Sequence, residues 1–161
     1  MLFRSRGLRD DQDAVAETIE NNMRRIITDE SPINPKYYDR MSELLDALIE
    51  QRRQQAISYQ EYLEQVKQLA RQVKPGADGT QGNYPPAIDT AAKRSLYDNL
   101  GQDEALACRI HDKIISTKKA DWIGNRFKER EVAGVIREEA GSYNINVDEV
   151  LEIVKKQSEY Q

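Results

Sequence analysis

The stretch SPINPKYYDRMSELLDALIEQRR, residues 31–53, decides the fold class of this chain. Asn34 is a favoured N-cap residue, and Pro35 follows it at the first helical position, where its missing N–H has no intrahelical partner. Seven apolar residues then recur at helical spacing: Tyr37, Tyr38, Met41, Leu44, Leu45, Leu48 and Ile49. Charged residues take the other faces. The stretch therefore predicts an amphipathic helix that packs against other helices.

One further amphipathic helix is predicted before this stretch and one after it. The earlier helix is expected to begin near Asp11 or Asp13, and the later one begins at a capping box of Ser58 and Glu61 and ends at Pro75. The apolar side of the earlier helix contains Val15, Ile19, Met23, Ile26 and Ile27. The apolar side of the later helix contains Tyr62, Leu63, Val66, Leu69, Ala70 and Val73.

Three or four short helices are predicted after the segment KPGADGTQGNYPP, residues 74–86. Gly101 ends the first, Asp103 caps the second, Gly141 ends the third, and Asn146 caps the last. The apolar positions expected on their buried faces are Ile88, Ala92, Leu96, Leu100, Leu106, Ile110, Ile114, Phe127, Val132, Val135, Ile136, Ala140, Val147, Val150, Leu151 and Val154.

The pattern as a whole predicts an all-α, bundle-like domain of six or seven amphipathic helices. Residues 1–161 are expected to form a single helical domain. Its helical halves, residues 1–73 and 87–161, are joined by the Gly/Pro-rich connector 74–86. The beginning MLFRSRGLRDDQ is more typical of a cut inside a longer protein than of a natural start.

Charge and cysteine content narrow the class of protein. The net charge is −4 with 32% charged residues, which does not favour a nucleic-acid-binding domain, whose usual mark is a basic excess. Cys108 is the only cysteine in the sequence, so an intrachain disulfide is impossible. The sequence has neither a signal-peptide pattern nor an apolar run of transmembrane length. A cytoplasmic protein with no membrane partner is therefore expected.

Catalytic and cofactor-binding motifs are absent from the sequence. Gly76, Gly79 and Gly82 are spaced by three, but no Lys-Ser/Thr follows them as a phosphate-binding loop requires. No Asp-x-Lys or Glu-x-Lys triplet provides the metal-binding carboxylate of a restriction-type nuclease. Gln55 and Tyr59 have a QxxxY spacing, which we interpret as an interhelix linker and a helix start. The sequence thus predicts no catalytic, cofactor-binding or metal-ligating residues.

Cys108 and His111 lie three residues apart on a predicted helix and could contact one metal ion. Two ligands do not complete a structural zinc site, and the sequence contains no other cysteine or histidine. We therefore interpret the pair as a buried thiol beside a half-exposed imidazole.

The segment KIISTKKADWIGNRFKER, residues 113–130, is the candidate interaction surface. Basic side chains interleaved with aromatic ones can follow a nucleic-acid backbone and stack on its bases. Alternatively, Trp122 and Phe127 anchor a corner between helices and the basic residues solvate it, which the net negative charge favours. The residues expected on this surface are Lys118, Lys119, Trp122, Arg126, Lys128 and Arg130.

Six blocks occur in order along the chain: DQDAVAETIENNMRRII, NPKYYDRMSELLDALIEQRR, ISYQEYLEQV, AAKRSLYDNLGQDEALA, DWIGNRFKEREV and VDEVLEIVKKQSEY. In this combination they resemble the C-terminal helical region of the R subunits of type I restriction-modification enzymes. The resemblance covers nearly the whole sequence. It implies a fragment of a larger bacterial-defence subunit that is an ATP-dependent DNA translocase and site-specific endonuclease.

The resemblance also implies a function. The nuclease and motor domains of such subunits, with their ATP and Mg, lie upstream, and none of their catalytic motifs matches a position here. The expected role is a non-catalytic assembly domain that docks the R subunit onto the methyltransferase core. The expected partners are the methyltransferase and specificity subunits and the upstream R-subunit domains, with DNA reached through the complex. The alternative is a DNA-contacting module that guides duplex between motor and methylase.

Overall fold

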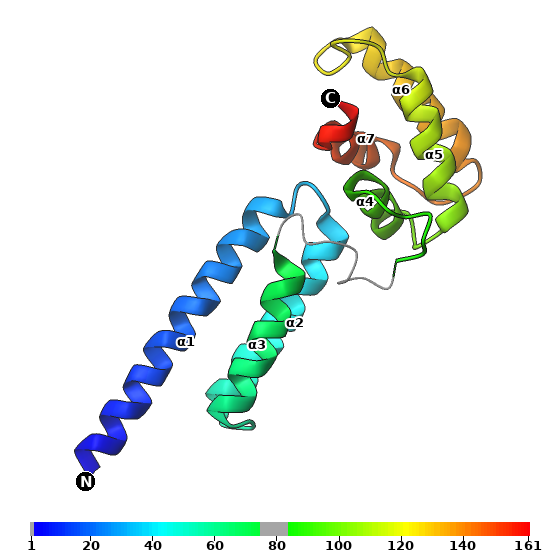
Figure 1. Ribbon diagram of the computed structural model, residues 1–161. Helices are drawn as coiled ribbons and strands as arrows, with labels where there is room; N and C mark the ends of the chain where they lie inside the picture. The colour runs from blue at the N-terminus through cyan, green and yellow to red at the C-terminus, as the bar shows by residue number, and fades with distance from the viewer. Residues whose placement is uncertain (1, 75–83) are drawn as a thin grey trace. The chain divides into compact units, whose positions relative to one another are not determined.

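A computed structural model describes residues 2–74 and 84–161, and over these residues the chain is all-helical, without a strand (Figure 1). The predicted fold class is therefore confirmed. The helices of the described residues are α1 (Leu2–Glu30), α2 (Pro35–Arg53), α3 (Tyr59–Val73), α4 (Ala91–Asn99), α5 (Glu104–Thr117), α6 (Arg126–Ala140), α7 (Val147–Lys155) and the 3-10 helix η2 (Ser158–Tyr160). None of the helices in these two ranges combines the length and the apolar character needed to cross a bilayer.

The chain divides by its contacts into two compact units. Unit 1 consists of Met1–Glu30 and Tyr38–Gln81, and unit 2 consists of Ser31–Tyr37 and Gly82–Gln161. The predicted connector, residues 74–86, contains the later boundary between the units. Its residues 75–83 lie outside the described residues, and so does the helix stop expected at Pro75. The sequence did not indicate that Ser31–Tyr37 belongs with the second half. Whether the two units act as a single domain stays a prediction.

The starts of α2 and α3 follow local capping chemistry. The backbone N–H of Tyr37 donates to the Asn34 side chain over 3.3 Å, as the predicted N-cap of α2 requires. Ser58 caps α3 by accepting from the N–H of Glu61 over 3.1 Å, and its hydroxyl donates to the Glu61 carboxylate over 3.2 Å. The expected start of the first helix near Asp11 is wrong, because α1 already begins at Leu2. Helical structure here extends beyond the apolar stripe, through polar residues without a proline.

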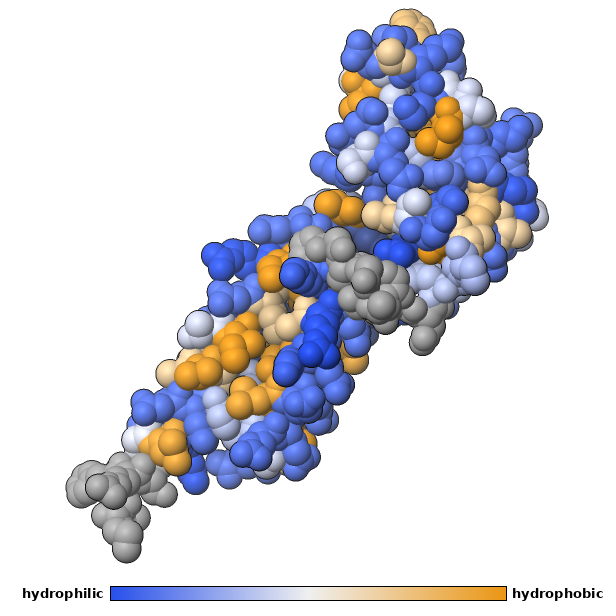
Figure 2. Space-filling view, in the orientation of Figure 1, coloured by the Kyte–Doolittle hydropathy of each residue, from blue (hydrophilic) through white to orange (hydrophobic). Residues whose placement is uncertain are grey.

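The core of unit 1 lies where the buried stripes of its three helices meet. Its buried apolar residues are Ala16, Met23, Ile27, Tyr38, Met41, Leu45, Leu48, Ile49, Tyr62, Val66, Leu69 and Val73. Apolar residues also gather in a band on the visible face of this unit, where α1 and α3 lie (Figure 2). The expected burial of Leu44, Val15 and Ala70 is wrong, since all three are exposed, Leu44 by 50%. On each of these helices the apolar stripe is wider than the part of the helix surface that the neighbouring helices cover.

Leu48 and Leu44 lie one turn apart on α2 and provide a test of this packing. Leu48→Ala is expected to lower the free energy of unfolding by about 2–5 kcal/mol, because it removes core volume. Leu44→Ala is expected to change it by only about 0.5 kcal/mol, since half of the side chain is already exposed. Urea denaturation of both variants measures the difference. Equal losses would show that Leu44 is a core residue after all.

Unit 2 packs α4–α7 and η2 around its own core. Side-chain N-caps begin each α-helix: Thr90 for α4, Asp103 for α5, Asn125 for α6 and Asn146 for α7. The caps Asp103 and Asn146 were predicted, whereas Thr90 and Asn125 were not. The core contains Ile88, Ala92, Leu96, Leu100, Leu106, Ala107, Ile110, Ile114, Trp122, Val132, Ile136, Val150, Val154 and Tyr160.

A polar cluster holds the segment Ser31–Tyr37 within unit 2. The carbonyl of Ile33 accepts from the Ser95 hydroxyl over 2.6 Å and from the Gln157 amide over 2.8 Å. The Asn34 amide donates to the Asp98 carboxylate over 2.8 Å, and the Asn34 oxygen accepts from the Asn99 amide, also over 2.8 Å. Asn34 therefore has two roles, as the N-cap of α2 and as a link to α4.

Candidate interaction site

The turn between α5 and α6 positions the residues of the predicted surface. Asn125 caps α6 by accepting from the backbone N–H groups of Phe127 and Lys128, both over 3.1 Å. The cap fixes Arg126 as the first residue of α6. We name this region the basic corner, defined by Lys118, Lys119, Arg126, Phe127, Lys128 and Arg130.

Trp122 is 2% exposed, so its predicted place on the surface is wrong, and its burial agrees with the favoured alternative, in which it anchors a corner between helices. Its indole N–H donates to the carbonyl of Tyr160 over 2.6 Å, and the Tyr160 hydroxyl forms a 2.6 Å hydrogen bond with Nδ1 of His111. Burial raises the pKa of Tyr160 and lowers that of His111. Trp122 is therefore the core anchor of the corner, and it presents no ring to a partner.

Phe127 was expected to help anchor the same corner, but it is 73% exposed. The buried stripe of α6 consists of Val132, Ile136 and Ala140, spaced by four. Phe127 precedes Val132 by five residues, or about 140° around the helix axis, and so lies on the opposite side. The most exposed large hydrophobic side chain of the described residues is thus at the start of α6.

Two of the three acidic residues of this region, Glu129 and Glu131, are engaged by other groups. Glu129 accepts from the backbone N–H of Gly124 over 2.5 Å and pairs with Lys155 over 3.1 Å; the hydrogen bond from Gly124 and then Lys155 lower its pKa. Glu131 pairs with Lys119 over 3.1 Å. Glu129 is thus neutralised by a cation from outside the corner, whereas Glu131 and Lys119 neutralise each other.

Three of the basic residues are uncompensated. Lys128 donates to the carbonyl of Ala120 over 2.7 Å, whereas in the described part of the chain no hydrogen bond or ion pair engages the side chains of Lys118, Arg126 and Arg130. Arg126 and Arg130 lie one turn apart and Phe127 precedes Arg130 by three, so Arg130 neighbours both of the other side chains on α6. The arrangement offers an exposed aromatic ring on the same side of α6 as two guanidinium groups that no ion pair engages in the described part of the chain.

The burial of Cys108 and His111 is the reverse of the prediction. His111 is buried beside Tyr160, whereas Cys108 is partly exposed. The helix turns His111 towards the core because it follows Ile110 and Ala107 on the buried face of α5. Among the described residues there is no group of three or more potential metal-ligating side chains.

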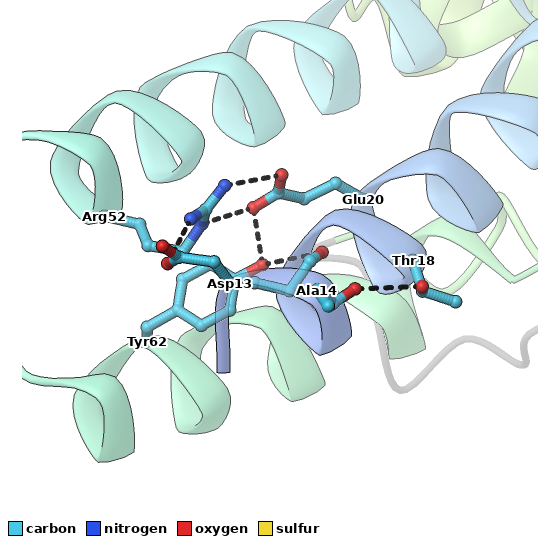
Figure 3. A network of polar contacts seen from close by, with 7 residues as sticks. Asp13, Ala14, Thr18, Glu20, Arg52 and Tyr62 are labelled. Atoms are coloured by element: carbon cyan, nitrogen blue, oxygen red, sulfur yellow. Dashed lines mark hydrogen bonds and ion pairs between the residues drawn. The ribbon is translucent and has the colours of Figure 1, made fainter. Parts of the chain in front are cut away.

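A buried polar network in unit 1 was not foreseen from the sequence (Figure 3). Arg52 binds the Glu20 carboxylate through two hydrogen bonds of 2.8 and 3.1 Å and also reaches Asp13 over 3.1 Å. The Tyr62 hydroxyl donates to Glu20 over 2.7 Å. Burial and then this hydrogen bond raise the pKa of Tyr62, and the hydrogen bond with Glu20 raises that of Arg52. The sequence signal that could have indicated this network is Glu20 itself. It is an acidic residue four positions after Ala16, on the buried side of α1.

Each charged group of the network has a partner within it, which favours a structural role over a chemical one. Beside it, cavities of about 380 and 420 Å³ are lined by side chains of both signs, without a convergence of one charge type. Gln55 and Tyr59 border the first cavity. Gln55 lies in the turn after α2 and Tyr59 is the first residue of α3, in agreement with their interpretation as linker and helix start.

Comparisons of the chain with models of known protein families, with curated proteins and with solved structures found no match. The resemblance to type I restriction R subunits therefore stays a prediction. The basic corner is the region of unit 2 in which an exposed aromatic side chain and uncompensated charges lie together.

Proposed function

We propose that this chain is a non-catalytic helical assembly domain that docks onto a partner protein through the basic corner. The observation that supports it is the 73% exposure of Phe127 between Arg126 and Arg130, whose side chains make no ion pair among the described residues. Aromatic residues and arginine are enriched at protein–protein interfaces and among their energetic hot spots. An exposed Phe with two Arg side chains on one side of it suits a partner with an apolar pocket that has carboxylates along one edge.

The partners we propose follow from the family resemblance. They are the methyltransferase and specificity subunits of a type I restriction complex, together with the upstream domains of the R subunit. ATP and Mg would act in those upstream domains, and the complex would work in the cytoplasm. The order of the six sequence blocks along the chain is what supports this assignment.

A DNA-guiding role is the rival function, and the charges around Phe127 disfavour it. Residues 118–131 contain five basic and three acidic side chains, a local balance of +2 in a chain of −4. A domain that binds the DNA backbone gains affinity by neutralising several phosphates from one surface. The three uncompensated cations are Lys118, Arg126 and Arg130, and Asp121 lies among them in the sequence. They can contact only a few phosphates.

Binding to the purified methyltransferase–specificity complex tests the docking role. The variant Arg126→Glu/Phe127→Ala is expected to bind about thirtyfold more weakly, the loss for a hot spot of about 2 kcal/mol. The matched control is Leu8→Ala/Arg9→Glu, which changes an exposed apolar residue and an exposed arginine on α1. The control is expected to bind as the wild type does. If both variants bind equally well, the basic corner is not the docking surface.

A salt titration of fluorescent duplex DNA tests the rival. The variant in which Lys118, Lys119, Arg126 and Lys128 are all replaced by glutamine is expected to differ little from the wild type, because the wild type has little DNA affinity to lose. Circular dichroism checks that its fold is intact, as expected for exposed pairs of small energetic value. Submicromolar binding at about 150 mM salt that collapses in this variant would establish the DNA-guiding role instead.

A further inference from the structure

Residues 157–161, which we name the strap, contain η2 and are held to unit 2 by side-chain contacts at both ends. At its start, the Gln157 amide donates to the carbonyl of Ile33 over 2.8 Å. Near its end, the Trp122 indole N–H donates to the carbonyl of Tyr160 over 2.6 Å, and the Tyr160 side chain is fully buried in the core. Because η2 has only three residues, these contacts and not helix formation keep the strap in place.

The hydroxyl of Tyr160 depends on a single residue, His111 of α5. It lies 2.6 Å from Nδ1 of the imidazole, and it makes no other hydrogen bond within residues 2–74 and 84–161. Since a buried O–H group needs an acceptor, the hydroxyl donates and Nδ1 accepts. Nδ1 is therefore without a proton while the strap is closed.

A proton on Nδ1 of His111 turns this acceptor into a donor. Two donors then face each other, and the Tyr160 hydroxyl can accept from the imidazolium only by turning its own proton into the apolar core. The charge of the imidazolium is also buried, since His111 is only 9% exposed. Release of Tyr160 removes both costs, because the imidazole and the hydroxyl then reach water.

Charged groups on and beside α4, α5 and η2 act on the imidazole, but burial outweighs them. The carboxylates of Glu159 on η2, Asp112 on α5 and Asp89 before α4 favour the imidazolium. Lys93 on α4 opposes it and forms an ion pair of 3.1 Å with Asp89. Burial has the largest effect and lowers the pKa of His111. The closed strap therefore has its full stability above the ordinary histidine pKa of 6.5 and loses stability as the pH falls below it.

We propose that the strap is a latch that acid opens: protonation of His111 releases Tyr160 and frees the indole N–H of Trp122, while α4–α7 stay folded. His111 is the only histidine of the chain, and histidine is the side chain that ordinarily titrates between about pH 5 and 8. Trp122 is the only tryptophan, so a single indole group reports the opening. The latch belongs to the core of unit 2 and does not depend on the docking role proposed for the basic corner.

Hydrogen exchange of the Trp122 indole N–H in the whole chain, followed by NMR, tests the latch. Its protection factor, taken relative to free tryptophan at the same pH, measures how rarely the strap opens. Between about pH 7.5 and about pH 5.5 this factor is expected to fall severalfold, with a limit of about tenfold for one proton bound by a released histidine. At both pH values it is expected to be at least about tenfold smaller than the protection factor of the Ile136 backbone N–H in α6, because the strap opens while the helices stay folded.

Variants of His111 assign the pH dependence to the imidazole. His111→Asn keeps an acceptor near the position of Nδ1, and its amide is not protonated in this pH range. The protection factor of the Trp122 indole N–H is therefore expected to be the same at both pH values. His111→Gln makes the same test with a residue of higher helix propensity. Glu159→Gln is the matched control, since it removes the carboxylate of the strap, and it is expected to retain the fall.

Circular dichroism at both pH values establishes that each variant keeps its helix content. A wild-type protection factor that does not change with pH overturns the latch. So does a fall that persists in both His111 variants or disappears in Glu159→Gln, because another group then titrates. Equal protection of the Trp122 indole and the Ile136 backbone N–H also overturns it, since the strap then opens only when unit 2 unfolds.

Discussion

Trp122→Ala is expected to lower the free energy of unfolding of unit 2 by about 3–5 kcal/mol, the range for removing a buried large aromatic side chain. The ring is 2% exposed in the core that α4–α7 and η2 share. The substitution opens a cavity, and it also leaves the buried carbonyl of Tyr160 without the indole N–H that lies 2.6 Å away. Urea denaturation followed by far-UV circular dichroism measures the loss.

The matched control for this experiment is Phe127→Ala, five residues further along the chain. Because Phe127 is 73% exposed, its truncation is expected to change the free energy of unfolding by about 0.5 kcal/mol or less. Two aromatic residues only five positions apart are thus expected to differ severalfold in their contribution to stability. A loss for Phe127→Ala as large as that for Trp122→Ala would mean that the corner packs differently from the structure described above.

Glu20→Ala is expected to destabilise unit 1 by about 3–5 kcal/mol, because it leaves the guanidinium of Arg52 partly buried without its main partner. Glu20 is buried and accepts from both Arg52 and Tyr62. The control is Glu17→Ala, which removes an exposed carboxylate from the same helix and is expected to cost about 0.5 kcal/mol or less.

The double variant Glu20→Leu/Arg52→Met separates the cost of leaving one buried charge without a partner from the cost of losing the whole ion pair. Replacement of a buried ion pair by apolar side chains of similar volume is often neutral or stabilising, so this variant is expected to be far more stable than Glu20→Ala. Thermal unfolding of the wild type and the three variants compares them. If the double variant is as unstable as Glu20→Ala, then burial of the charges is not what makes the single change costly.

Helix starts were predictable from the sequence where a cap and the first turn decide them together. Asn34, Ser58, Asp103 and Asn146 were predicted to begin helices, and the structure has a helix starting after each of them. Each of these starts depends on hydrogen bonds within three residues, so local sequence is sufficient to identify it. The start of α1 was not predicted, since no side-chain cap or apolar periodicity marks it.

The exposure of single side chains was harder to predict than the helices themselves. Trp122 lies before α6 and Phe127 in its first turn, and helical periodicity cannot place Phe127 until Asn125 is known to cap α6. Leu44 belongs to an apolar stripe that is wider than the surface which the neighbouring helices cover. The pairing of Glu20 with Arg52 joins residues 32 apart in sequence, and the packing of α1 against α2 decides it. Long-range geometry of this kind is not encoded in local patterns.

The link from Ile33 to Gln157 spans 124 residues, so it has a consequence for the order in which the molecule forms during synthesis. When the ribosome has released α1 to α3, the groups that hold Ser31–Tyr37 have not yet been made. The polar groups of Ile33 and Asn34 must remain hydrated until α4 and the residues after α7 have been synthesised. Closing so long a chain segment is entropically slow, and we expect the C-terminal unit to be completed last. A nascent chain that stops before Ser95 therefore leaves this segment accessible to proteases and chaperones, and one that stops before Gln157 holds the Ile33 carbonyl through Ser95 alone.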